Sequence, residues 1–79
     1  MNARVWLNLE AGAGTTVHDA IREGIRVAGI LRCGVELLVG TIVIPLEHDS
    51  DLIDMAKAWE EALAEGLLVA LPPDVRHLR

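Results

Sequence analysis

The stretch Val35–Leu46 constrains the fold of this 79-residue chain more than any other segment. It is almost wholly aliphatic, and Gly40-Thr41 divides it in two. Glycine at the first central position suits a type II′ turn, so the stretch is typical of a β-hairpin. The alternative, one strand of about twelve residues, would be long for so small a domain. We favour the hairpin because its register puts three aliphatic pairs on one face: Val39 with Ile42, Leu37 with Ile44, and Val35 with Leu46.

A strand and a helix are predicted before this hairpin. Residues Arg4–Glu10 alternate between apolar and polar, which puts Trp6 on the face opposite the three aliphatic residues of that strand. Thr16 and Asp19 have the spacing of a capping box, which marks the start of a helix. Apolar residues then recur at helical spacing as far as Arg32, where a glycine two residues on indicates the helix end.

A second helix is predicted after the hairpin. Asp49 or Ser50 would cap its start, and Gly66 would end it. Leu67–Leu71 is then a short apolar strand, stopped by Pro72-Pro73. The buried side of this helix is predicted to comprise Leu52, Ile53, Met55, Ala56, Trp59, Ala62 and Leu63.

The predicted order is strand, helix, hairpin, helix and strand, in one domain spanning residues 1–79. This βαββαβ order favours an α+β ferredoxin-like sandwich, with a four-stranded antiparallel sheet and both helices on one face. A three-stranded βαβαβ layer is the alternative if Val35–Leu46 forms one strand. In the sandwich, Trp6, Leu38 and Val43 would lie on the open sheet face. Either Leu68 and Ala70 or Leu67, Val69 and Leu71 of the last strand would join them. Because exposed apolar patches usually meet a partner, we expect that face to contact another protein or a second copy.

Acidic residues are concentrated in the second half of the chain. Nine lie between Glu36 and Asp74 with a single base, Lys57, whereas the first 35 residues hold three acids and four bases. The net charge is −5, which repels nucleic acid and anionic membranes and attracts basic partners. Seven of the nine acids lie on or just before the second predicted helix and are the predicted partner-binding residues: Glu47, Asp49, Asp51, Asp54, Glu60, Glu61 and Glu65.

The glycines at 12 and 14 are the nearest approach to a cofactor motif. They lie between a predicted strand and a helix amino terminus, where backbone N–H groups can bind anions. A dinucleotide motif would need a further glycine where Val17 stands, and a P-loop would need a lysine before Thr15. We therefore favour a flexible connection, with a small-anion site at Thr15 and Thr16 as the alternative.

Metal ligands and nucleophiles are sparse. The acids around His48 lack the glycine, the terminal glutamate and the ligand number of a calcium loop, so helix capping explains them better. Cys33 is the only cysteine, which suits a reducing compartment. The start of the chain lacks the apolar run of a signal peptide, and no stretch is long enough to span a membrane. We predict a cytoplasmic protein without enzymatic activity, metal or other cofactor, and without direct binding to nucleic acid or membrane.

Two resemblances add to this interpretation. Asp19-Ala20-Ile21 through Ala28-Gly29-Ile30 resembles the first helix of PII-like regulators, and Glu65-Gly66-Leu67-Leu68-Val69 resembles their second helix and last strand. Those proteins are trimers of ferredoxin-like domains that bind nucleotides or similar ligands. The chain lacks room between Val39 and Ile42 for their ligand-sensing loop, so this resemblance implies the fold alone. In size and charge the chain is also similar to small phage-encoded inhibitors, anti-CRISPR proteins among them, some of which mimic nucleic acid.

The sequence therefore favours a non-enzymatic binding protein. Its acidic helix would dock on a basic, nucleic-acid-binding surface of another protein, as an inhibitor of the anti-CRISPR kind would do. The alternative is a PII-like regulatory oligomer that binds a small anion or nucleotide near Gly12–Thr16.

Overall fold

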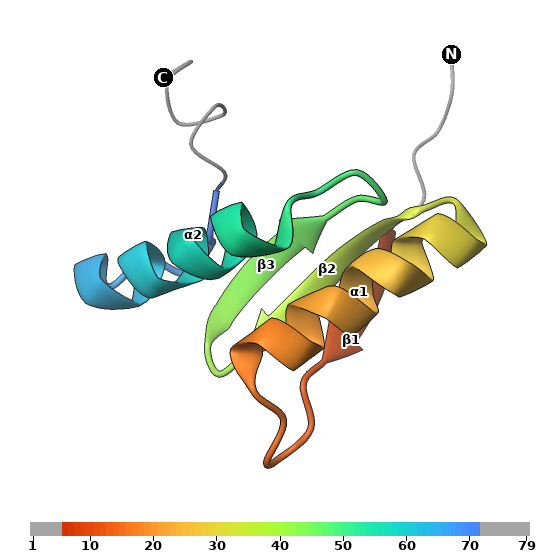
Figure 1. The fold of residues 1–79 in the computed structure, drawn as a ribbon. Coiled ribbons are helices and arrows are strands. Elements are labelled where there is room, and N and C mark those ends of the chain that lie inside the picture. The colour runs from red at the N-terminus through yellow and green to blue at the C-terminus, as the bar shows by residue number, and fades with distance from the viewer. Residues whose placement is uncertain (1–5, 72–79) are drawn as a thin grey trace.

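The computed structural model describes residues 6–71, so the predictions for Arg4, Val5, Pro72-Pro73 and Asp74 lie outside the described residues. The fold is α+β, with one three-stranded mixed sheet and two helices that lie on the same face of it (Figure 1). The elements in chain order are β1 (Trp6–Glu10), α1 (Val17–Leu31), β2 (Gly34–Val39), β3 (Ile42–Leu46) and α2 (Leu52–Glu65).

β1 and β2 are parallel and pair directly, with Leu7 opposite Val35 and Leu9 opposite Leu37. Parallel neighbours need a crossover connection, and α1 provides it over the face of the sheet (Figure 1). In a ferredoxin-like, split β-α-β arrangement another strand separates the two parallel strands. Since no strand lies between β1 and β2, the ferredoxin-like arrangement is not confirmed.

β2 and β3 form the predicted hairpin. Gly40, at the first central position of the turn, has a φ of 65°. Among the described non-glycine residues only Arg32 has a positive φ, so Thr41 does not, and this combination is that of a type II′ turn. The register is the predicted one, with Val39 opposite Ile42, Leu37 opposite Ile44 and Val35 opposite Leu46. All six side chains are buried, so the predicted buried face is confirmed.

The segment after α2 forms less sheet than predicted. Leu67–Leu71 contributes one parallel bridge, in which Val69 lies opposite Val43. The N–H of Val43 donates to the Leu68 carbonyl at 2.8 Å, and the N–H of Ala70 donates to the Val43 carbonyl at 2.9 Å. The four-stranded antiparallel sheet is therefore wrong, because α2 is a crossover that returns the chain parallel to β3. Three strands match the alternative in number, although the hairpin produces them instead of one long strand.

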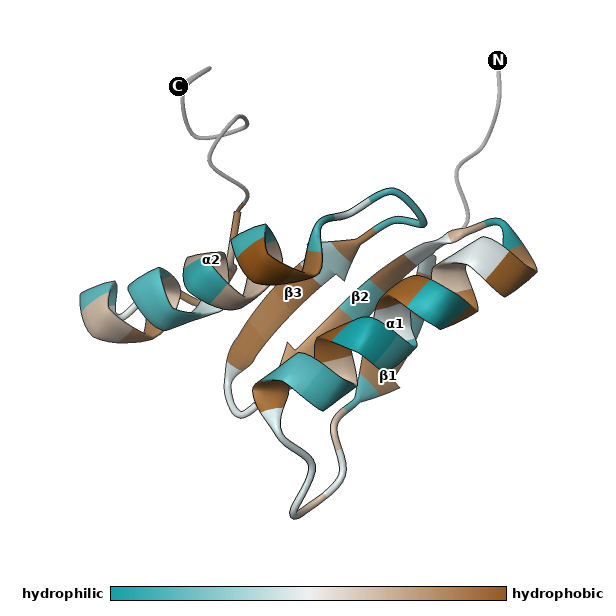
Figure 2. Cartoon of the chain, in the orientation of Figure 1, coloured by the Kyte–Doolittle hydropathy of each residue, from teal (hydrophilic) through white to brown (hydrophobic). Residues whose placement is uncertain are grey.

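The hydrophobic core lies between the sheet and the helices (Figure 2). Its largest fully buried side chains are Ile21, Val35, Ile44 and Leu46. α1 approaches the sheet closely at Gly24, where a Cβ atom would lie 2.6 Å from Cδ1 of Leu46. α2 packs on the sheet through small side chains instead of a glycine. Besides Met55, the residues that it buries are three alanines: Ala56, Ala58 and Ala62.

Part of the predicted buried side of α2 is wrong. Ile53 and Leu63 are exposed, whereas Ala58 is buried without having been predicted. At 3.6 residues per turn, Ile53 lies at one margin of the predicted side and Ala58 just beyond the other, so the true buried side is displaced toward Ala58. Trp59 is half-buried, and its Nε1–H donates to the Val39 carbonyl at 3.4 Å.

α2 begins later than predicted, because Asp51 is its N-cap instead of Asp49 or Ser50. The Asp51 carboxylate accepts the N–H of Asp54 at 3.0 Å. The hydroxyl of Ser50 is already engaged, since its Oγ accepts the N–H of Glu47 at 2.8 Å. The turn from Glu47 to Ser50 therefore occupies the hydroxyl that would otherwise be able to cap α2.

Both helices end at the predicted residues, in the left-handed conformation. Gly66 follows α2 with a φ of 72°, and Arg32 follows α1 with a φ of 55°. The cap N–H groups donate to helix carbonyls, that of Arg32 to Ala28 and that of Gly66 to Ala62 and Leu63. This conformation is costly for a residue with a Cβ atom, so α1 ends less favourably than α2.

Candidate protein-interaction surfaces

The predicted partner-binding acids divide into two groups. Glu47, Asp49 and Asp51 precede α2, and local structure involves two of them: the Glu47 backbone bonds to Ser50, and the Asp51 carboxylate caps the helix. Glu47 is half-buried, while Asp49 and Asp51 are exposed. This first group lies in the connection from β3 and is not part of the outward face of α2.

The second group lies on α2 itself. Glu61 and Glu65 follow Asp54 by seven and eleven residues, and these intervals place all three along one side of the helix. Asp54, Glu60 and Glu65 are exposed, and Glu61 is half-buried. Lys57 is the only base of α2, so four acids less one base give this helix a charge of −3. Hydrophilic residues occupy the outward sides of both helices in Figure 2.

Helix stability explains only part of this charge. Asp54 lies in the first turn of α2, where the helix dipole favours a carboxylate. Glu65 is the last residue of the helix, where the dipole disfavours one, and the last turn holds no base. Glu65 therefore stands where the helix dipole alone would not put it.

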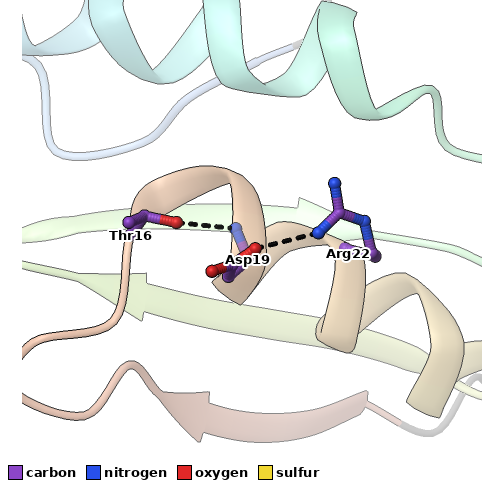
Figure 3. Close-up of polar contacts among 3 residues, drawn as sticks. All are labelled: Thr16, Asp19 and Arg22. Carbon is purple, nitrogen blue, oxygen red and sulfur yellow. Dashed lines mark hydrogen bonds and ion pairs between the residues drawn. The ribbon is translucent and has the colours of Figure 1, made fainter.

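The charges of α1 are balanced and paired. Thr16 is the N-cap as predicted, with its Oγ1 accepting the N–H of Asp19 at 3.1 Å, and Nη1 of Arg22 donates to Oδ1 of Asp19 at 2.8 Å (Figure 3). Arg26 likewise donates to the carboxylate of Glu23. This hydrogen bond lowers the pKa of Glu23 and raises the pKa of Arg26. Both ion pairs are exposed.

The predicted residues of the open sheet face lie on that face but not together. Leu38 and Val43 are opposite each other on β2 and β3, and Val69 continues the row. Trp6 stands at the other end of the sheet, opposite Gly34. Its indole ring covers this glycine, because a Cβ atom there would lie 2.6–2.7 Å from ring atoms.

This face is also less apolar than expected. Asn8 and Glu10 of β1 are exposed on it, and so is Glu36 of β2. Leu38 and Val43 are half-buried, so little of their surface is available to a partner. A continuous apolar patch from Trp6 to Val43 is therefore not formed.

A further apolar surface lies at the carboxy-terminal end of α2, and the sequence predicts it only in part, through alternate residues of the last strand. Leu63 was predicted to be buried, and Leu67 and Leu68 were assigned to a regular strand, yet all three are exposed together with Val69. The signal was present in the sequence, because Leu67–Leu71 is an uncharged run that directly follows the helix-ending Gly66.

Two of the polar groups at the predicted anion site are engaged in local hydrogen bonds. The N–H of Thr15 donates to the Gly12 carbonyl at 3.1 Å, and the Thr16 hydroxyl caps α1. The small-anion site therefore stays a prediction. Within residues 6–71, no three His, Cys, Asp or Glu side chains are grouped so as to hold a metal ion. None of the described helices has the length and apolar character needed to cross a membrane.

Comparisons with protein families, with characterised proteins and with solved structures find no match to this chain. The resemblances to PII-like regulators and to phage-encoded inhibitors accordingly stay predictions.

Proposed function

We propose that this chain is a non-enzymatic binding protein whose α2 docks on a basic surface of another protein. The observation that carries the proposal is the charge of α2, −3 on an exposed helix, beside a neutral α1. Because the basic surfaces of nucleic-acid-binding proteins accept phosphates, carboxylates at such a surface would compete with the nucleic acid. An inhibitor that mimics nucleic acid in the cytoplasm is the form of this function that we favour.

Asp54 suits the helix dipole, but no described ion pair gives Glu60 or Glu65 a structural role. The two described ion pairs both lie on α1, and none involves Asp54, Glu60 or Glu65. Glu65 opposes the helix dipole. An exposed carboxylate that lowers the stability of its own helix, as Glu65 does, is best explained by attraction to a basic partner.

Such docking should be steered by charge. Exposed charges are screened over ~8–10 Å at physiological ionic strength, so association should be fast at low salt and slower as salt is added. Changes to the exposed carboxylates should therefore act mainly on the association rate and on the salt dependence.

A matched pair of variants tests the proposal. The α2 variant is Glu60→Lys with Glu65→Lys, and the α1 variant is Asp19→Lys with Glu23→Lys, so the net charge changes equally in both. The partner is first captured from the native host. Its affinity for each variant is then measured, together with the ability of each variant to displace nucleic acid from it.

We expect the α2 variant to lose about tenfold or more in affinity, and the α1 variant to lose much less, because electrostatic attraction depends on where the charge lies. The unmodified chain should displace nucleic acid, and its affinity should fall with salt. An equal loss in the two variants would contradict the proposal, because net charge and not α2 would then control binding.

A further inference from the structure

Four exposed apolar residues lie at the sheet edge that follows α2. Leu63, Leu67, Leu68 and Val69 have 57%, 45%, 68% and 43% of their surface exposed. Leu63 lies near the end of α2 that projects past β3 in Figure 1. The other three belong to the segment that meets β3 at a single bridge. We call these four residues the carboxy-terminal apolar edge.

The backbone of Val69 faces away from the sheet. The carbonyl of Leu68 and the N–H of Ala70 both bond to Val43. Because bonding groups alternate along a strand, the N–H and the carbonyl of Val69 point to the opposite, outer side. No other described residue bonds to them. Val69 therefore presents one donor and one acceptor at the outer edge of the described sheet.

We propose that a second copy of this chain pairs with this edge. In an antiparallel pair, two residues that face each other exchange both of their N–H···O bonds. Val69 can do so with Val69 of a second copy across a two-fold axis, which joins the two sheets. A two-fold contact needs only one self-complementary surface, and this edge supplies it.

Charge favours a second copy at this edge over contact elsewhere on the molecule. Two chains of net charge −5 repel each other over most of their surface, while Leu67–Leu71 holds no charged residue. The repulsion is therefore weakest where the apolar side chains and the free backbone groups are exposed.

Area sets the strength of this contact. A stable dimer buries about 800 Å² on each partner, and four partly exposed side chains supply only part of that. The dimer should thus form at micromolar concentrations or above, and dissociate on dilution. It should hold or strengthen as salt is added, since salt screens the repulsion between the two acidic copies. This salt response is opposite to that of the proposed docking, so the two ideas can fail separately.

Analytical ultracentrifugation of the full chain over a range of concentrations tests the proposal. Val69→Pro removes the outward N–H and leaves both bonds to Val43 in place, because proline lacks only its own N–H. Leu68→Lys is a second disruptive variant that does not change the backbone. Ile53→Lys is the matched control, since Ile53 is similarly exposed at the other end of α2. Circular dichroism checks that each variant is folded.

We expect the unmodified chain and Ile53→Lys to dimerise equally, and Val69→Pro and Leu68→Lys to weaken the dimer by about tenfold or more. A chain that stays monomeric up to about 1 mM would overturn the proposal. Dimers that survive both edge substitutions would overturn it too. So would a dimer that is lost in Leu38→Lys and kept in Leu68→Lys, because the open sheet face would then be the contact.

Discussion

α1 and α2 cover the same face of one sheet, yet they differ in charge. α1 has two acids and two bases, and both acids are bonded to arginines one turn away. α2 has four acids and one base. A helix needs an apolar side and polar residues opposite, and α1 shows that balanced charges meet that need. The imbalance of α2 is therefore a property that packing does not require.

The two helices also differ in how they pack and how they end. α1 approaches the sheet through Gly24 and ends at Arg32, whereas α2 packs with alanines and ends at Gly66. α2 has the more favourable carboxy-terminal cap, but it carries charge that opposes its dipole there. The carboxylate that opposes the dipole of α2 and the carboxy-terminal apolar edge therefore lie at the same end of the helix.

The largest expected effect comes from filling the close contact of α1. Gly24→Val should lower the free energy of unfolding by about 1–3 kcal/mol, because Leu46 is fully buried and cannot move away. Gly29→Val is the control on the same helix, because a Cβ atom there meets only His48 at 3.7 Å. Urea unfolding measures both. Equal losses would mean that α1 does not pack as closely as described.

The amino-terminal caps should contribute equally to the two helices. Asp51→Ala and Thr16→Ala should each cost about 1 kcal/mol of unfolding free energy, because each leaves a helix N–H without its acceptor. Asp49→Ala should have no measurable effect on stability, since Asp51 is the cap. A larger loss for Asp49→Ala than for Asp51→Ala would place the start of α2 at the originally predicted residue.

The carboxy-terminal caps should respond in opposite directions. Gly66→Arg should destabilise the protein by about 1 kcal/mol, because a residue with a Cβ atom is strained in the left-handed conformation. Arg32→Gly removes that strain from α1. Arg32→Gly should therefore stabilise the protein by less than about 1 kcal/mol, since glycine also adds conformational freedom to the unfolded chain. Thermal unfolding of the two variants compares them directly.

Neutralising one acid at each end of α2 should give effects of opposite sign. Glu65→Gln should raise the free energy of unfolding by about 0.3–1 kcal/mol, because it removes a carboxylate from the negative end of the helix dipole. Asp54→Asn should lower it by a similar amount, because it removes one from the positive end. Urea titrations at low salt measure both changes. Two changes of the same sign would show that the dipole does not govern these sites.

The smallest effect concerns the ion pair between Glu23 and Arg26. The hydrogen bond from Arg26 holds the pKa of Glu23 below its ordinary value in the folded chain. A lowered carboxyl pKa contributes stability above the unfolded pKa, and this is lost as the pH falls through the folded pKa. The contribution should be slight, because both side chains are exposed. An NMR titration should show the lowered pKa, and Arg26→Gln should return the pKa toward its ordinary value.

Local features of the fold could be predicted from the sequence. Gly40 fixes the turn, and the aliphatic alternation around it fixes the register, so the hairpin followed from neighbouring residues alone. The sheet order could not be predicted in this way. Whether β1 lies beside β2 or is separated from it depends on how α1 packs, and the sequence pattern is the same in both cases.

The candidate surfaces, like the fold, could be predicted only where neighbouring residues determine them. The acidic side of α2 followed from the spacing of Asp54, Glu61 and Glu65. The N-cap did not, because three neighbouring polar residues could all cap. The bond between Ser50 and Glu47, which removes Ser50 as the cap, forms only in the folded turn. The exposure of Leu63 was missed because a helix that extends past its sheet leaves apolar side chains uncovered near its end.

The order of the strands has a kinetic consequence. Each strand lies beside the next one in the chain, and Val69 returns to β3, so no pairing spans more than one connection. The hairpin closes over two residues, but the parallel pairing of β1 with β2 and that of β3 with Val69 each span a whole helix. Closing these longer loops costs more entropy, and parallel pairing is slow. We expect this protein to refold more slowly than a helical bundle of its size, in stopped-flow experiments that follow tryptophan fluorescence. The hairpin would then form before the two parallel pairings that complete the sheet.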